Sequence, residues 1–285
     1  MQKRTGIHTR SRAGKTQNTS TMAVSAVRLL PKEAQQALMN VDLIVGATYT
    51  PFDTIYTVAH AVQRELGADH AQVLSISSAC SSFVNAMEVV EGYFATGKAS
   101  SALVVVAEHN SAYSHDEDAQ SGHLWGDGAA AVWLTASADT HSLAEVLSMS
   151  TRGGATMYKS STAVTLQPLK NGLQMPYGRH VFFNAVTYME VILRKELSKN
   201  SFATNDLTYV VPHQANQRIS KQLARQLQLD ATRLLSTIEK YGNTGAAGAV
   251  ITLSENAIKF QPGDLIGVTV FGGGYSMGAM LLKWL

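Results

Sequence analysis

The sequence has very little cysteine: Cys80 is the single one among 285 residues. This scarcity excludes an internal disulfide and every metal motif that is built from several cysteines. The sequence also lacks an apolar signal core near its beginning and any run of about 18 apolar residues, so we expect neither secretion nor a membrane span. We therefore expect a cytoplasmic protein, because a reducing compartment keeps a lone thiol usable.

Charged residues are also scarce, at 15% of the chain, whereas hydrophobic residues make up 45%. This composition allows an ample core and suggests that part of the surface is buried against a partner. The net charge of +2 identifies no partner by its sign, but no acidic residue precedes Glu33. The basic stretch before it could bind phosphates or an acidic protein, act as a transit peptide, or form a solvated tail.

Apolar runs typical of strands alternate with helical patterns along the whole chain, which predicts an α/β fold with sheets buried between helices. The order of elements in the first half resembles that in the second, so we expect one α/β unit used twice. The join falls near residues 137–143, which predicts two domains at 1–137 and 138–285. A helix is expected over residues 22–39, with an interruption at Pro31.

Cys80 is expected where a strand over residues 71–77 turns into a helix that runs through Phe94. Exposed backbone N–H groups and the helix dipole at such a junction favour a thiolate. A thiolate is the form that attacks a thioester carbonyl. The alternative from position alone is a buried, inert cysteine.

Three further features could support a reactive cysteine. His213 and Asn243 follow strand-like or turn-like segments and could supply an imidazole nitrogen and an amide N–H to a ligand. The glycines at 272–274 follow a strand, so a backbone N–H there could approach a ligand without interference from a Cβ. Each has an ordinary alternative, namely a hydrogen-bonded core histidine, a turn asparagine and a tight turn.

A metal site is not expected. Several acidic residues and histidines gather between residues 109 and 123, but their spacing fits no recognised ligand pattern, and an exposed loop explains them better. They are His109, His115, Asp116, Glu117, Asp118 and His123.

Taken together, eight segments in the order of the chain resemble β-ketoacyl-acyl carrier protein synthase III, a condensing enzyme of the thiolase superfamily. The segments are residues 4–10 (RTGIHTR), 42–48 (DLIVGAT), 78–83 (SACSSF), 103–108 (LVVVAE), 126–129 (GDGA), 213–216 (HQAN), 242–244 (GNT) and 271–274 (FGGG). The resemblance implies a thiolase-like fold of two similar α/β halves in an α-β-α-β-α sandwich. The half 1–137 would carry the nucleophile and the half 138–285 the His and Asn.

The resemblance implies roles for individual residues. Cys80 would accept the acyl group, and the N–H groups of Cys80 and Gly273 would form the oxyanion hole. His213 and Asn243 would bind the thioester oxygen of a malonyl donor and stabilise the enolate that forms as CO2 leaves.

The resemblance also implies partners. Arg4 would pack on the adenine of coenzyme A, and Arg218 would contact the acidic face of acyl carrier protein. It further implies a homodimer with residues 51–56 near the partner subunit. No nucleic acid, metal or redox cofactor is expected.

The implied reaction loads Cys80 from acyl-CoA or an acyl carrier protein thioester, then condenses the acyl group with malonyl-acyl carrier protein in a decarboxylative Claisen reaction. A reversible thiolase is disfavoured because it needs a second cysteine. Two alternatives stay open: a non-catalytic or weakly active subunit of a condensing complex, and an acyltransferase of specialised metabolism that does not decarboxylate.

The chain departs from the family pattern in three places. The family begins with a strand and a helix ahead of the segment at 4–10, and this first strand is absent from the sequence, which would expose a sheet edge. Ser82 stands where a Gly is usual, and Gly245 stands where a Ser is common. We expect these two to signal a non-standard acyl group.

Overall fold

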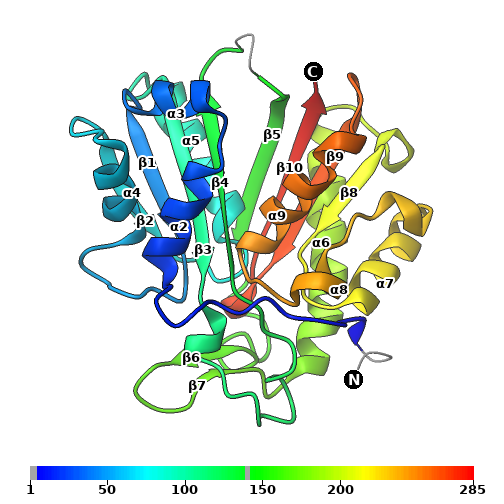
Figure 1. Cartoon of the computed structure of the whole chain (residues 1–285). Coiled ribbons are helices and arrows are strands. Elements are labelled where there is room, and N and C mark those ends of the chain that lie inside the picture. Colours follow the sequence, from blue (N-terminus) through cyan, green and yellow to red (C-terminus); the bar gives the residue numbers. More distant parts are fainter. Residues whose placement is uncertain (1–4, 139–141) are drawn as a thin grey trace.

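The computed structural model describes residues 5–138 and 142–285, and Figure 1 shows two sheets side by side with a small lobe below them. The N-terminal sheet has the strand order β2-β1-β3-β4. Strands β1 and β2 are parallel to each other, as are β1 and β3, whereas β4 is antiparallel to β3. The bounds are β1 (Leu43–Ala47), β2 (Gln72–Ile76), β3 (Ser101–Glu108) and β4 (Gly128–Thr135).

The C-terminal sheet has the order β5-β10-β9-β8. Strands β8 and β9 are parallel and β10 is antiparallel to β9, so this trio repeats the arrangement of β1, β3 and β4. One α/β unit is therefore used twice, as predicted; the division at 137–138 falls between β4 and β5 and stays a prediction. The bounds are β5 (Ala144–Gly153), β8 (Tyr209–Pro212), β9 (Leu265–Phe271) and β10 (Ser276–Trp284).

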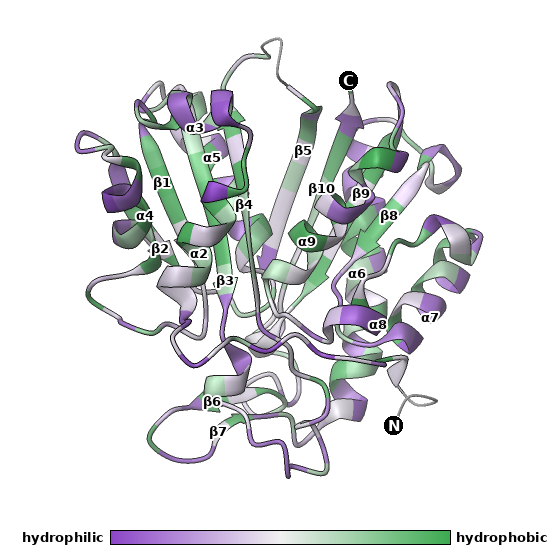
Figure 2. Cartoon of the chain, in the orientation of Figure 1, coloured by the Kyte–Doolittle hydropathy of each residue, from purple (hydrophilic) through white to green (hydrophobic). Residues whose placement is uncertain are grey.

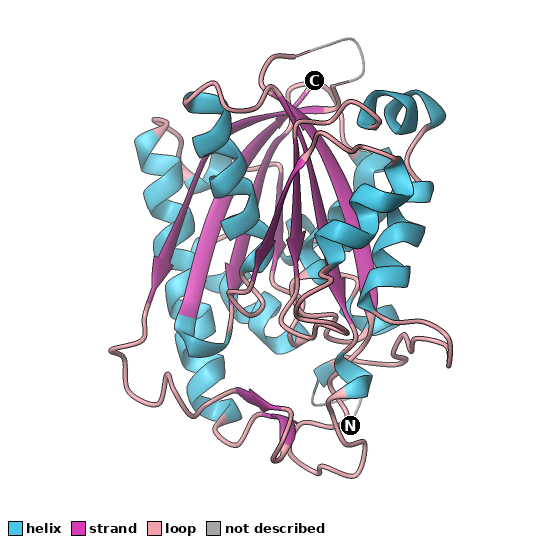
Figure 3. Ribbon diagram, turned by 90° about the vertical axis from the view of Figure 1, so that its left-hand side faces the viewer, coloured by secondary structure: helices cyan, strands magenta, loops and turns pink. Residues whose placement is uncertain are grey.

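The helices form three layers around the two sheets, and the side view in Figure 3 shows helices on both sides of the strands. Helices α2 and α4 pack on the outer face of the N-terminal sheet, and α6 and α7 belong to the outer layer of the C-terminal sheet. Helices α5 and α9 lie between the sheets, where one core cluster joins side chains from both. The predicted α-β-α-β-α sandwich is confirmed.

The helix bounds follow local signals in the sequence. The helix expected over residues 22–39 is two helices, because Pro31 cannot donate a backbone hydrogen bond and instead precedes the second helix. Gly67 ends α4 in the left-handed conformation at φ 64°. The helices are α2 (Thr19–Arg28), α3 (Lys32–Leu38), α4 (Val58–Leu66), α5 (Ser82–Ala95), α6 (Gly178–Lys199), α7 (Gln217–Leu227), α8 (Ile238–Tyr241) and α9 (Ala247–Asn256).

The lobe below the sheets contains the hairpin of β6 (Thr165–Gln167) and β7 (Gly172–Gln174), which the sequence analysis missed together with β5. Figure 1 shows this lobe at the end of the sheets opposite the C-terminus. Strand β10 runs toward that terminus, so the antiparallel β9 and its parallel neighbour β8 end at the lobe. In Figure 2 the strands β1 and β8 are largely hydrophobic, whereas α3 and α7 carry hydrophilic faces.

Strand β4 forms one edge of its sheet, whereas its counterpart β10 pairs with strands on both sides. Most residues of β10 are buried, and all eight residues of β4 are only partly buried. In the part of the chain that the structure describes, β4 therefore lies at the edge of its sheet, whereas β10 is flanked by β5. Among the same residues, no helix combines the length and apolar character that a bilayer crossing needs.

Gly46 of β1 offers a test of the packing between the outer helix layer and the N-terminal sheet. A Cβ at this position would lie 2.8 Å from the backbone N of Ala59 in α4. We expect Gly46→Ala to push α4 away from β1 and lower the free energy of unfolding by about 1–3 kcal/mol. Chemical denaturation would measure this change.

Gly92 of α5 is the matched control, because a Cβ there meets nothing within 4 Å. Gly92→Ala is expected to raise the free energy of unfolding by about 0.5–1 kcal/mol, since Ala loses less backbone entropy in a helix. Equal effects of the two substitutions would contradict the tight contact between α4 and β1.

Candidate active site

Cys80 lies in the turn between β2 and α5, with 8% of its surface exposed. The preceding Ala79 takes a left-handed φ of 50°, which is uncommon for a residue with a side chain. The hydroxyl of Ser82 supports this turn, because its Oγ accepts from the Ser78 N–H at 2.8 Å and donates to the Ala79 carbonyl at 2.6 Å. Ser82 thus holds the backbone around the cysteine.

The C-terminal half reaches Cys80 through the glycines that follow β9. A Cβ on Gly272 would lie 2.7 Å from the backbone N of Cys80, so only glycine fits between them. The backbone N–H of Gly273 forms a hydrogen bond that lowers the pKa of the Cys80 thiol, as does the N–H of Cys80 itself. The structure thus brings together the two N–H groups that were predicted as an oxyanion hole.

The lobe covers this point from outside. A Cβ on Gly273 would lie 3.3 Å from the Cβ of Val164, which directly precedes β6. Val164 and Leu166 belong to a hydrophobic cluster that also includes Trp125 and Tyr49. Gly273, whose N–H is hydrogen-bonded to the Cys80 side chain, therefore lies against an apolar side chain of this cluster.

The thiol itself departs from the expectation of a resting thiolate. Burial, with a smaller contribution from the nearby Glu108, raises the pKa of Cys80 to about 12, although the hydrogen bond with Tyr49 acts to lower it. The prediction of a thiolate from the strand-to-helix junction was wrong, because loss of water outweighs the helix N-terminus. Any negative charge that formed on this sulfur would need hydrogen-bond donors to stabilise it.

Glu108 is a buried carboxyl at the end of β3 that the sequence analysis did not single out as a site residue. Burial raises its pKa to about 8, although it accepts hydrogen bonds from the hydroxyls of Thr48 and Thr50 and from the backbone N–H of Tyr49. At neutral pH it is therefore mostly protonated. In this form it adds no negative charge beside the sulfur.

Tyr49 was also missed, and it connects Cys80 to Asn243. Its hydroxyl donates to Asn110 Oδ1 at 2.7 Å and takes part in a hydrogen bond with the Cys80 side chain. The amide nitrogen of Asn110 donates in turn to the carbonyls of Gly126 at 2.7 Å and Asn243 at 3.2 Å. The side chain of Asn243 accepts from the Gly245 N–H at 3.0 Å, so its amide nitrogen is the end that can donate to a ligand.

His213 directly follows β8 and is 5% exposed. Its backbone N–H donates to the Thr269 carbonyl at 2.8 Å, and Thr269 lies on β9 three residues before Gly272. Burial lowers the pKa of His213 to about 4, so its imidazole is neutral at physiological pH. The strand end that contacts Cys80 therefore also positions His213.

Arg4 and Arg218 are the two basic residues that were predicted to contact coenzyme A and acyl carrier protein. Arg4 lies outside the described residues. Arg218 is exposed in the first turn of α7, where its backbone N–H donates to the Asn216 side chain at 2.9 Å. Arg218 therefore lies on the surface, six residues after Pro212, the last residue of β8.

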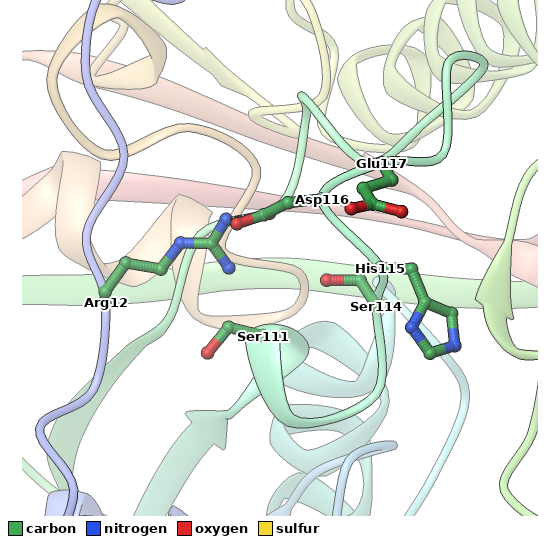
Figure 4. Close-up of a pocket in the computed structure, with 6 residues that line it drawn as sticks. All are labelled: Arg12, Ser111, Ser114, His115, Asp116 and Glu117. Atoms are coloured by element: carbon green, nitrogen blue, oxygen red, sulfur yellow. Dashed lines mark hydrogen bonds and ion pairs between the residues drawn. The ribbon is translucent and has the colours of Figure 1, made fainter.

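A cavity of about 410 Å³ lies between the N-terminal segment and the loop after β3, and Figure 4 shows its lining residues. The carboxylate of Asp116 forms ion pairs with Arg12 and, at 3.4 Å, with Arg10. Within residues 5–138 and 142–285, no group of three or more His, Cys, Asp and Glu side chains could hold a metal ion. The cavity is lined by Arg12, Ser111, Ser114, His115, Asp116 and Glu117.

A second cavity, of about 170 Å³, lies beside the site, between the end of β2 and the segment that leads to α4. Thr48 and Ser77 line it, and these residues are sequence neighbours of Tyr49 and of the cysteine turn. The exposed residues Phe52 and Ile55 belong to the same segment, with 70% and 87% of their surfaces exposed.

Comparisons with known proteins agree with this geometry. Two family models match: the one described as 3-oxoacyl-[acyl-carrier-protein] synthase III at residues 74–153, and the C-terminal one at residues 197–284. The chain is 35% identical to "Beta-ketoacyl-[acyl-carrier-protein] synthase III" of Rhodospirillum centenum and 37% identical to that of Aquifex aeolicus. These matches cover 99% of this chain and 88% and 89% of those relatives.

Solved structures give the same result. The 3-oxoacyl-[acyl-carrier-protein] synthase III of Aquifex aeolicus matches with a TM-score of 0.91 at 33% identity, over 99% of this chain and 90% of that one. The enzyme from Pseudomonas aeruginosa matches with a TM-score of 0.90 at 30% identity, over 99% and 88% of the two chains. The sequence resemblance and the thiolase-like fold are confirmed, and the chain belongs to the 3-oxoacyl-[acyl-carrier-protein] synthase III family.

Proposed function

We propose that this chain performs the family's condensation with Cys80 as the nucleophile. The sulfur attacks the carbonyl carbon of an acyl-CoA, the bond to the coenzyme A sulfur breaks, and the thiol proton ends on that leaving sulfur. The observation that carries the proposal is the pair of backbone N–H groups, from Cys80 and Gly273, that meet at this sulfur from the two halves of the chain. Donors held in place before the reaction stabilise the oxyanion at little reorganisation cost.

The second step uses His213 and Asn243. A malonyl thioester loses CO2, and the electron pair of the broken bond forms an enolate whose oxygen is held by the two side chains. A neutral imidazole suits this role because it donates one N–H without adding a titrating cation. The enolate carbon then attacks the acyl-Cys80 carbonyl, forms the new carbon–carbon bond and releases the sulfur, which takes up a proton. Because decarboxylation supplies the carbanion, the sequence of steps needs no metal or redox cofactor.

We propose malonyl-acyl carrier protein as the extender and a homodimer as the working form. The exposed Arg218 offers positive charge to an acidic carrier protein. The exposed Phe52 and Ile55 form an apolar surface beside the cavity at Thr48, which suits burial against a second subunit. A cytoplasmic location suits the free thiol.

Acylation of Cys80 is the first test. Incubation with a panel of acyl-CoA thioesters followed by intact mass measurement should show one added acyl group, and Cys80→Ala should show none. The lone cysteine makes the assignment unambiguous. A chain that is folded but never acylated would support the non-catalytic subunit instead.

Variants of His213 and Asn243 should separate acyl transfer to Cys80 from decarboxylation of the malonyl thioester. We expect His213→Ala and Asn243→Ala to form the acyl adduct within a few-fold of the wild-type rate, while CO2 release from malonyl-acyl carrier protein falls about 100-fold or more. His70→Ala, on an exposed turn, is the control and should change neither step. Product formation without CO2 release by the wild-type enzyme would favour the non-decarboxylating acyltransferase.

The dimer is tested by Ile55→Asp, which places a charge on the proposed interface. Light scattering should show a dimer for the wild-type chain and a monomer for the variant, because an unpaired charge resists burial. Ile258→Asp is the matched control, since Ile258 is 91% exposed on another face and should leave the dimer intact. A monomeric wild-type chain at micromolar concentration would refute this part of the proposal.

A further inference from the structure

Tyr49 is held close to the nucleophile by the ends of two neighbouring strands. It follows β1 by two residues, and β1 is paired in parallel with β3 so that Ala47 lies opposite Val106. The backbone N–H of Tyr49 donates to both carboxyl oxygens of Glu108, at 3.4 and 3.3 Å. The position of the tyrosine therefore follows from strand register and not from a mobile loop.

The tyrosine hydroxyl has two neighbours that compete for its single proton. It donates to Asn110 Oδ1 at 2.7 Å, and it is also hydrogen-bonded with the Cys80 side chain. The amide of Asn110 cannot present its nitrogen instead, because that nitrogen already donates to the carbonyls of Gly126 and Asn243. With a neutral thiol, the tyrosine proton points to Asn110 and its oxygen is left to accept from sulfur.

Gly245 makes room for this tyrosine. A Cβ there would collide with the Tyr49 hydroxyl and lie 2.8 Å from its Cε1, and the φ of 59° also favours glycine. The space at Gly245 is thus filled by a tyrosine from the other half of the chain.

We propose that the Tyr49 hydroxyl is a catalytic hydrogen-bond donor, which turns from Asn110 Oδ1 to the Cys80 sulfur as the thiol loses its proton. This proposal rests on the proposed function and deepens it. The thiol proton leaves sulfur and ends on the departing coenzyme A sulfur, whereas the tyrosine keeps its own proton throughout. When the acyl bond to Cys80 has formed, the hydroxyl returns to Asn110.

The groups around the sulfur support a donor at this place. Glu108 from β3 raises the pKa of Cys80. Burial and the same carboxyl also raise the pKa of Tyr113, in the turn after β3. The Tyr49 hydrogen bond acts in the opposite direction and lowers the thiol pKa. Burial keeps the pKa of Tyr49 well above 10, so the hydroxyl stays protonated and able to donate.

The test is the pH dependence of Cys80 alkylation by iodoacetamide in the full chain, followed by intact mass. We expect Tyr49→Phe to raise the kinetic pKa by about one unit and to slow alkylation about tenfold at neutral pH, as loss of one hydrogen bond to a charged group predicts. Tyr93→Phe on α5 is the control and should change neither value. If folded Tyr49→Phe left the kinetic pKa of Cys80 unchanged, the proposal would be overturned. A purely structural role of Tyr49 would slow acyl transfer without shifting that pKa.

A second variant tests the switch of the Tyr49 hydroxyl from Asn110 to the Cys80 sulfur, and it should move the kinetic pKa of Cys80 in the opposite direction. Asn110→Ala removes the competing acceptor, so the kinetic pKa of Cys80 should fall, and in the Tyr49→Phe background the same change should have no effect. A rise or no change in the single variant would overturn the switch. Because iodoacetamide needs no acyl-binding site, normal alkylation without acylation by acyl-CoA would refute the proposed function and leave the Tyr49 result interpretable.

Discussion

The site depends on one close approach of two backbones. Gly272 from the C-terminal half lies against the backbone N of Cys80 from the N-terminal half, and any Cβ between them would clash. Helix α5, which begins just after the cysteine, packs against strands of both sheets. The two N–H groups that we propose as oxyanion donors come from different halves, so they are aligned only when both sheets pack on the central helices. The five-layer core therefore fixes the chemistry as well as the stability.

Burial at this junction leaves the site nearly uncharged before reaction. The Cys80 pKa is raised to about 12, the Glu108 pKa is raised to about 8, and the His213 pKa is lowered to about 4, each chiefly by burial. All three groups are thus mainly neutral at physiological pH. In the proposed reaction negative charge forms on sulfur and on carbonyl oxygens, where donors fixed in a site with little water would stabilise it more than water could.

Local pattern predicted the alternation of strands and helices and the position of Cys80 between a strand and a helix, whereas the five layers and the roles of the site residues were implied by the family resemblance. Apolar runs marked the strands, Pro31 marked a helix break, and Cys80 fell at a strand-to-helix junction. Strand β5 was missed because it mixes polar and apolar residues at a sheet edge, and the β6–β7 hairpin because its strands are only three residues long. The state of the thiol was mispredicted because burial is a tertiary property that no local motif reveals.

Ser82 and Gly245 have local roles that the sequence alone could not assign. The hydroxyl of Ser82 is hydrogen-bonded within the turn that holds Ala79 at positive φ. Gly245 leaves space that the Tyr49 side chain fills from the other half of the chain. Both residues therefore act on the sulfur and its backbone. Any influence of Gly245 on an acyl group would be indirect, through the Tyr49 side chain for which it leaves space. Since Tyr49 reaches the sulfur while its ring joins the apolar cluster of Val164 and Leu166, one residue borders both the sulfur and that cluster.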